Sequence, residues 1–116
     1  MEISLAHDRY DCVAGCAVEA TLDLIDGKWK GVILYHLSQN GLRFGEMRRK
    51  FPNITQRMLT KQLRELEESG LITRTVHAQV PPRVDYALSP LGESLRPVID
   101  ALKQWGDAFL ARKQAA

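Results

Sequence analysis

Two cysteines four positions apart, Cys12 and Cys16, carry the most distinctive chemistry in this chain of 116 residues. Zinc binding is disfavoured, because C-x3-C is not the usual C-x2-C spacing and only His7 lies nearby in the sequence. A disulfide between them needs Cα atoms about 4.4–6.8 Å apart, which a helical turn or tight loop allows and an extended segment does not. Packing as small buried hydrophobic side chains is a further open alternative.

A reactive thiol is the remaining interpretation of these residues. Cys16 stands at or just before the start of a predicted helix, where the helix macrodipole stabilises a thiolate, although Asp11 and Glu19 oppose this effect. Cys16, with Cys12, is therefore a candidate redox sensor beside the structural alternative. The sequence places no base beside Cys16, which argues against a thiol enzyme. We expect no enzyme activity, no catalytic residue, no metal site and no cofactor.

A block of basic side chains is the second candidate site. Residues 43–64 hold seven basic residues and one acidic residue, a net charge of +6, whereas residues 1–42 carry a net charge of −3. Because the block falls inside a patterned segment and not in a tail, it indicates a surface that faces phosphate groups. The alternative is an ordinary solvated surface.

The elements that position these residues follow from the hydrophobic spacing. One domain is expected at this length. The spacing of Val18, Leu22 and Ile25 predicts a first helix over residues 17–25. Asp26 is expected to cap a second helix, which ends at Asn40-Gly41.

Two further helices are predicted around the basic block. "LRFGEMRRKF" reads as a short amphipathic helix, with Phe44, Met47 and Phe51 on its apolar face. Thr55 is expected to be the N-cap of a longer helix that Gly70 terminates. The buried stripe of that helix is Leu59, Leu63 and Leu66.

The period then changes from helix to strand. "LITRTVHA" and "RVDYAL" predict a β-hairpin with Pro81 and Pro82 at its tip and Arg83 near its end. Ser89-Pro90 predicts the start of a terminal helix over residues 90–113, which Pro97 kinks or breaks. Its apolar stripe can bury against its own domain or against a second chain, and we favour a dimer interface formed by Leu91, Leu95, Val98, Leu102, Trp105 and Phe109.

This order of elements predicts a winged helix-turn-helix. The fold class is mostly α with a small β-hairpin (α+β), with flanking N- and C-terminal dimerisation helices. A flexible N-terminal arm is expected over residues 1–11, and the domain over residues 12–116. A helix fits the major groove, where Gln, Arg and Lys read base edges while other basic groups contact phosphates. The predicted DNA-binding residues are Arg43, Arg48, Arg49, Lys50, Thr55, Gln56, Arg57, Thr60, Lys61, Arg64 and Arg83.

Three quoted segments carry a family resemblance: "CAVEATLDLIDGKWKGVILYHL", "LRFGEMRRKFPNITQRMLTKQLRELEESGLITRTV" and "VPPRVDYALSPLGESL". They resemble the HxlR family of bacterial winged helix-turn-helix regulators, near the MarR group, from about Cys16 to Trp105. The resemblance implies a homodimer with contacts from the terminal helices. Trp29 and Trp105 are expected as core or interface anchors, or as the lining of a MarR-like effector pocket.

The resemblance also bears on the cysteines. The family usually has a cysteine immediately before its first helix, often followed by proline, and in several members this thiol senses quinones, aldehydes, hypochlorite or disulfide stress. Cys16 occupies that position, with Ala17 in place of proline. Some members pair this cysteine with a later one in the partner subunit, and here no cysteine follows residue 16. A switch must then use Cys12, a bridge between Cys16 residues or between Cys12 and Cys16 of two subunits, a small-molecule thiol cap, or alkylation.

The predicted function is a homodimeric, sequence-specific DNA-binding transcription regulator, a repressor that senses electrophiles or oxidants through Cys16. Its expected partners are double-stranded DNA with a pseudo-palindromic operator, a second copy of the chain, and a thiol-reactive or small-molecule effector. The alternatives are a MarR-like regulator that binds its effector non-covalently, with structural cysteines, or a winged-helix protein-interaction module. No apolar run approaches the roughly 20 residues of a membrane span, and no secretory signal is recognisable, so we expect a cytoplasmic location and no membrane partner.

Overall fold

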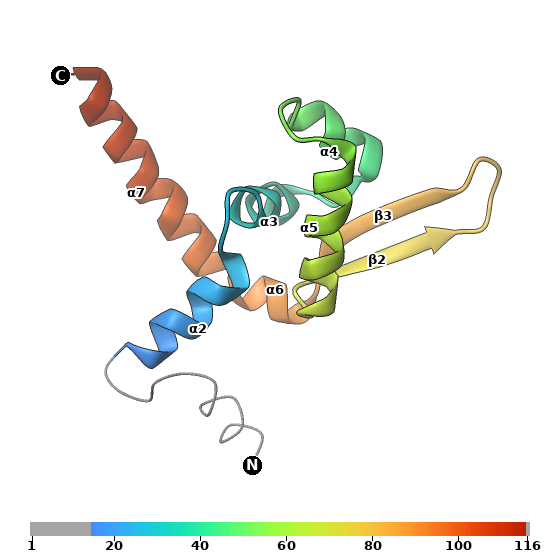
Figure 1. Cartoon of the computed structure of the whole chain (residues 1–116), viewed down its shortest axis with the longest axis horizontal. Helices are drawn as coiled ribbons and strands as arrows, with labels where there is room; N and C mark the ends of the chain where they lie inside the picture. Colours follow the sequence, from blue (N-terminus) through green and yellow to red (C-terminus); the bar gives the residue numbers. More distant parts are fainter. Residues whose placement is uncertain (1–14, 116) are drawn as a thin grey trace, which may run out of the picture.

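The structure is a computed structural model that describes residues 15–115. The predicted arm and Cys12 lie outside these residues. A helical layer and a small antiparallel sheet form the body, from which a hairpin and a long C-terminal helix project in different directions (Figure 1). The elements are α2 (Cys16–Ile25), α3 (Lys30–Gln39), β1 (Leu42–Arg43), α4 (Phe44–Lys50), α5 (Gln56–Glu68), β2 (Ile72–His77), β3 (Arg83–Leu88), α6 (Pro90–Ser94) and α7 (Arg96–Ala115).

The core lies where α3, α4 and α5 meet the sheet. Each of these helices turns an apolar face inward, as the sequence periodicity requires. The predicted stripe of α5 is buried, and Met47 of α4 and Ile33 of α3 pack with it. The remaining core residues come from α3, the loops, the sheet and α7, and are Leu34, Leu37, Leu42, Phe51, Ile54, Leu71, Ile72 and Ile99.

Side-chain caps fix two helix starts where the sequence predicts them. The Thr55 hydroxyl accepts the Met58 N–H at 3.0 Å, and the Ser89 hydroxyl accepts the Gly92 N–H at 3.0 Å. The predicted cap at Asp26 is wrong. A turn over residues 27–29 follows Asp26, so that α3 begins at Lys30 with Trp29 as its N-cap residue.

The sheet has three strands in the order β1-β3-β2. The predicted hairpin is formed by β2 and β3, and β1, which was not predicted, pairs with β3 as a third strand. Leu42 pairs with Tyr86 and Arg43 with Asp85. The backbone at Arg43 is extended, and its N–H is accepted by the Glu46 carboxylate at 2.8 Å. Helix α4 therefore starts at Phe44, two residues later than the apolar pattern suggests.

The predicted terminal helix is broken into α6 and α7, as Pro97 indicates. Pro97 is the second residue of α7, where the missing N–H costs no helical hydrogen bond. Beyond this first turn α7 extends away from the body (Figure 1). Of the predicted stripe, Leu95 is half-buried, and the exposed members are Leu91, Val98, Leu102, Trp105 and Phe109. Burial of the stripe against its own domain is therefore wrong.

Candidate nucleic-acid interface

Helix α5 presents a polar and basic face opposite its buried leucines. The strong separation of polar and apolar residues along α5 makes one side of the helix part of the core and leaves the other in solvent. The exposed side chains line a shallow hollow of about 660 Å3, and they are Gln56, Arg57, Thr60, Lys61 and Arg64. All five are among the predicted DNA-binding residues, and the structure brings them together on one surface.

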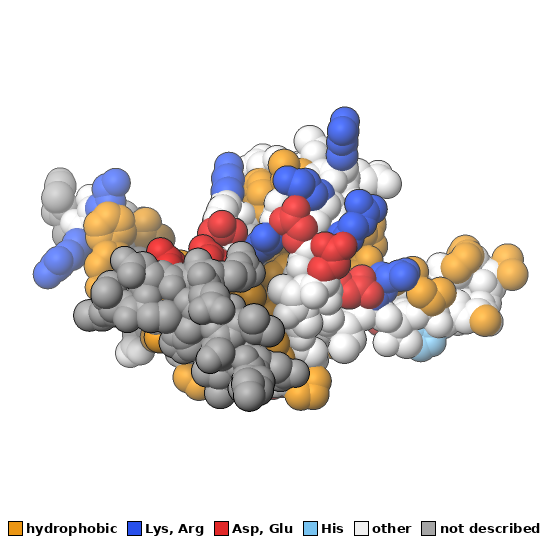
Figure 2. All heavy atoms as spheres, turned by 60° about the horizontal axis from the view of Figure 1, so that its bottom comes forward, with side chains coloured by type: hydrophobic (Ala, Val, Ile, Leu, Met, Phe, Trp, Pro, Cys, Tyr) orange, Lys and Arg blue, Asp and Glu red, His pale blue; other side chains and the backbone are white. Residues whose placement is uncertain are grey.

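Helix α4 and its preceding strand flank that face with further basic residues. Arg43, Arg49 and Lys50 are exposed. Arg48 differs, because it is half-buried and its Nε, among the described residues, has no hydrogen-bond partner. In the space-filling view, basic side chains gather over the α4–α5 region, and hydrophobic ones lie along the projecting α7 (Figure 2).

Glu65 modulates the charge of the α5 face. Its carboxylate lies 2.9 Å from the Lys30 ammonium and 3.7 Å from that of Lys61. The hydrogen bond from Lys30, helped by the charge of both lysines, lowers the pKa of Glu65. Lys61 is therefore partly neutralised, whereas Arg57 forms no ion pair within residues 15–115.

The wing holds a three-residue polar cluster that the sequence reading did not anticipate. The Arg83 guanidinium donates to both carboxylate oxygens of Asp85, with the shortest contact at 2.9 Å. His77 Nε2 lies 2.9 Å from the same carboxylate, across the strand pair. The pKa of Asp85 is lowered, first by the Arg83 hydrogen bond and then by that of His77, and the pKa of Arg83 is raised by Asp85.

Arg83 lies near the hairpin tip, as the sequence predicts. Arg83 is the first residue of β3 and pairs with His77, and residues 78–82 lie between it and the end of β2. Its guanidinium is also held by Asp85 on its own strand. The spacing Arg83-x-Asp85 could have indicated this ion pair from the sequence, because alternate residues of a strand share a face.

A second hollow, of about 560 Å3, lies between α2, α3 and α7. Its wall is mainly apolar, with Lys28 and Lys103 among the lining residues. The expectation that Trp29 and Trp105 line such a pocket is wrong. Trp29 packs against Phe51 with ring centroids 6.5 Å apart, and Trp105 stacks on Phe109 at 5.3 Å.

Cys16 is the first residue of α2, which confirms its predicted position at the head of this helix. Gly15 precedes it as the N-cap residue with φ +102°, a left-handed conformation that favours glycine. No side chain of α2 is fully buried, although Leu24 and Ile25 pack partly against the core. Chemistry at Cys16 therefore takes place outside the core of the domain.

Within residues 15–115, no group of three or more His, Cys, Asp or Glu side chains is arranged to hold a metal ion. Over the same residues, no helix combines the length and apolar character that crossing a membrane requires.

The α3–α4–α5 body, the β2–β3 wing and the exposed basic face of α5 together define a winged helix-turn-helix domain of the kind found in transcription regulators. The HxlR-like helix-turn-helix family model matches residues 24–114. The chain belongs to the HxlR family of helix-turn-helix proteins, and the relatives that it matches are transcriptional regulators.

Individual relatives agree with this assignment. An uncharacterised helix-turn-helix transcriptional regulator of Bacillus subtilis (strain 168), YdeP, is 55% identical over 102 residues, which is 88% of this chain and 80% of YdeP. The redox regulator HypR in its reduced form superimposes with a TM-score of 0.81 at 48% identity, covering 86% of this chain and 99% of HypR. The reduced form of the B. subtilis regulator YodB superimposes with a TM-score of 0.69 at 33% identity, covering 78% and 89% of the two chains.

Proposed function

We propose that this protein is a homodimeric, sequence-specific DNA-binding repressor. The observation that carries the proposal is the exposed face of α5, whose polar and basic side chains stand opposite leucines buried in the core. A helix of this kind fits the major groove, with Gln56 suited to adenine and Arg57 or Lys61 suited to guanine. Thr60 and Arg64 extend the same face.

Phosphate contacts come from the flanking residues in this proposal. Arg43, Arg49 and Lys50 are exposed beside α5 and fix the register of the helix in the groove. Arg48 contributes less, because its guanidinium is partly buried. Arg83, held by Asp85 on β3, contacts the backbone or the minor groove beside the wing.

The second protomer is proposed to dock on α2 and α7. Trp105 is 69% exposed, Val18 is 61% exposed, and the stacked Trp105–Phe109 pair lies on a helix that projects from the body. Exposed aromatic side chains of this size mark protein interfaces. A two-fold dimer would place two α5 helices in successive major grooves about 34 Å apart on a pseudo-palindrome.

We further propose that Cys16 makes DNA binding sensitive to oxidants. The thiol stands at the head of α2, an element of the proposed dimer contact. The similarity to HypR, a redox regulator, favours this chemistry. Oxidation by diamide would join two thiols in a disulfide, with the two electrons and two protons passing to diamide to form the hydrazine.

A second candidate is a regulator that responds to a non-covalent effector. The hollow of about 560 Å3 between α2, α3 and α7 favours it, because its size suits a small organic molecule. In that case Cys16 is structural.

The experiment for DNA binding measures affinity for the protein's own upstream intergenic DNA by fluorescence anisotropy. Arg57→Ala should weaken specific binding by about tenfold or more and relax the preference for guanine at the contacted base pair. Arg112→Ala removes the same charge from the last turn of α7 and serves as the matched control, with little change expected. Unchanged specific affinity in Arg57→Ala would favour the protein-interaction alternative.

Oligomeric state and thiol sensing need separate measurements. Sedimentation should give a dimer that Trp105→Ala weakens. Diamide should lower the DNA affinity of the wild type and leave Cys16→Ser unchanged, with Cys12→Ser reporting whether Cys12 is the partner thiol. Tight binding before and after oxidation would reject the thiol switch but not the DNA-binding function. A reporter gene that becomes more active when the gene for this protein is deleted would support repression.

A further inference from the structure

Helix α7 enters the core through its first turn alone, and its second turn contacts α3, where the Lys103 ammonium lies 5.9 Å from the centre of the Tyr35 ring. Ile99 is 3% exposed and packs in the core, and Leu95, just before the helix, is half-buried. Farther along, Leu102 is 51% exposed and Trp105 is 69% exposed. With 20 residues α7 is about 30 Å long, and the part that follows Lys103, about three-fifths of its length, projects beyond these contacts.

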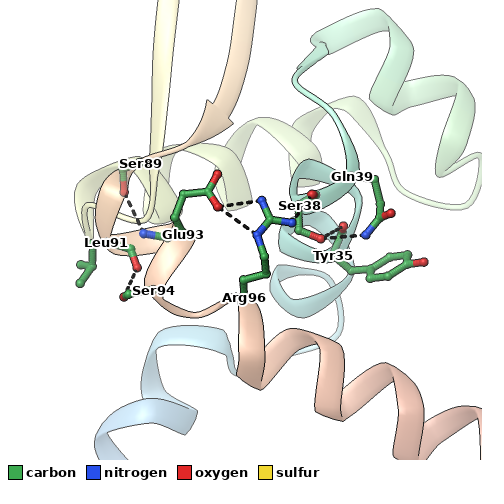
Figure 3. A network of polar contacts seen from close by, with 9 residues as sticks. Tyr35, Ser38, Gln39, Ser89, Leu91, Glu93, Ser94 and Arg96 are labelled. Atoms are coloured by element: carbon green, nitrogen blue, oxygen red, sulfur yellow. Dashed lines mark hydrogen bonds and ion pairs between the residues drawn. The ribbon is translucent and has the colours of Figure 1, made fainter.

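Arg96, the first residue of α7, joins three elements at this attachment (Figure 3). Its Nε and Nη2 donate to one carboxylate oxygen of Glu93 on α6, at 3.0 and 2.7 Å. Its Nη1 donates to the carbonyl oxygen of Ser38 in the last turn of α3, at 2.5 Å. A guanidinium presents donors in a rigid fork, so these two acceptors restrict the direction in which α7 leaves the body.

The acceptor on α3 is itself well fixed. Ser38 is buried, its hydroxyl donates to the Tyr35 carbonyl at 2.6 Å, and Gln39 Nε2 donates to the same hydroxyl at 3.1 Å. Carbonyl groups in the last turn of a helix attract cations because the helix dipole is negative there. Arg96 thus ties α7 to the end of α3, a helix that packs directly against α5 in the core.

We propose that Arg96 is a positioning residue that sets the angle between α7 and the DNA-binding body, and through it the half-site spacing that the dimer recognises. The inference rests on the proposed dimer. If two copies meet through the projecting part of α7, the angle at its first turn determines how far apart the two α5 helices lie.

The geometry gives this angle a large effect. A rotation of about 10° at the first turn displaces the far end of a helix about 30 Å long by about 5 Å. Half-sites on DNA lie about 3.4 Å apart per base pair, so this displacement corresponds to more than one base pair. The ion pair itself contributes little to folding, because the Arg96 and Glu93 side chains are 40% and 52% exposed and water screens their attraction. Removing it is therefore expected to loosen the angle and leave the fold intact.

The test compares wild type with Arg96→Ala on operators whose half-site spacing is lengthened or shortened by one base pair. Wild type should lose at least about tenfold in affinity at the altered spacings, and Arg96→Ala less than about threefold. Affinity for a single half-site should be the same in both proteins. Glu93→Gln should have an intermediate effect. Arg74→Ala removes the same charge from an exposed ion pair with Glu67, away from α7, and should keep the wild-type preference.

A distance measurement provides the second readout. A spin label at Thr60→Cys, on a background with Cys12 and Cys16 changed to serine, reports the separation of the two α5 helices in the dimer. The distance distribution should broaden in Arg96→Ala. An Arg96→Ala dimer with unchanged spacing preference and unchanged distribution would overturn the role of Arg96. A monomeric wild type in sedimentation would instead reject the proposed dimer. If Arg96→Ala does not fold, Arg96→Lys, which keeps the charge but cannot bridge both acceptors, is measured in its place.

Discussion

Replacing Gly92 by alanine is expected to destabilise the protein strongly. Gly92 is buried on α6 against the backbone that leads into β2. A Cβ at this position would lie 2.1 Å from the Leu71 carbonyl oxygen and 3.3 Å from the Leu88 Cβ. The oxygen cannot move away freely, because it accepts the Ser89 N–H at 3.0 Å. The glycine is thus required by the close approach of α6 to the sheet.

The magnitude follows from what must move. A contact of 2.1 Å is shorter by more than 1 Å than an ordinary carbon–oxygen contact, so α6 must shift by about that amount. Overpacking of this kind costs about 1–3 kcal/mol, and disrupting the Ser89–Leu71 hydrogen bond adds about 1 kcal/mol. The free energy of unfolding should therefore fall by about 2–4 kcal/mol, which lowers Tm by roughly 8–15 °C for a domain of this size.

Gly45→Ala is the matched control for this prediction. Gly45 is an exposed residue of α4, and an added Cβ there would meet only the end of the Arg49 side chain, at 4.0 Å. Because alanine favours a helix more than glycine does, this variant should gain about 0.5–1 kcal/mol. Urea unfolding at one fixed protein concentration measures both variants. Equal stability of Gly92→Ala and Gly45→Ala would refute the packing argument.

Three further predictions concern a helix cap, a half-buried histidine and the wing. Thr55→Ala removes the acceptor of the Met58 N–H and should cost about 1 kcal/mol in urea unfolding, with Thr55→Ser restoring most of it. Burial, and then the charge of Lys50, lowers the pKa of His36, so the unfolded chain binds more protons near pH 6.5 and wild-type stability is lost as the pH falls below that value. His36→Asn should lack this loss between about pH 7.5 and 5.5, and parallel stability curves would contradict it. Asp85→Asn removes the charge that holds Arg83, so competition assays should show stronger binding to non-specific DNA and a lower specificity ratio.

Local features of the fold were predictable from the sequence, and features defined by distant partners were not. Thr55 and Ser89 cap helices through contacts three residues away, which a short stretch of sequence encodes. Strand β1 has two residues and exists because Leu42 meets Tyr86, more than forty positions later. A prediction based on hydrophobic periodicity therefore assigns the two residues of β1 to the start of α4.

The candidate interface shows the same division. The exposed face of α5 follows from helical periodicity alone, so the prediction identified its five residues together. The direction of the Arg83 side chain depends on which acceptor it binds, and helical or strand periodicity does not specify this. In the structure its guanidinium donates to Asp85 on the same strand. Arg96 was not anticipated, because its bond to the Ser38 carbonyl joins residues far apart in the chain. The spacing Glu93-x-x-Arg96 was the one local indication.

On the proposed function, stability and DNA geometry are controlled by different parts of this molecule. The core draws on α3, α4, α5 and the sheet, whereas α2 contributes no fully buried side chain and α7 is anchored by its first turn. Changes at Gly92 or Thr55 therefore act on unfolding, because they alter packing or capping in the body. On the proposed function, changes at Cys16 or Arg96 alter the arrangement of two intact bodies on DNA. A regulator built in this way changes its operator binding without unfolding its DNA-binding domain, since the elements that set dimer geometry carry little of the core.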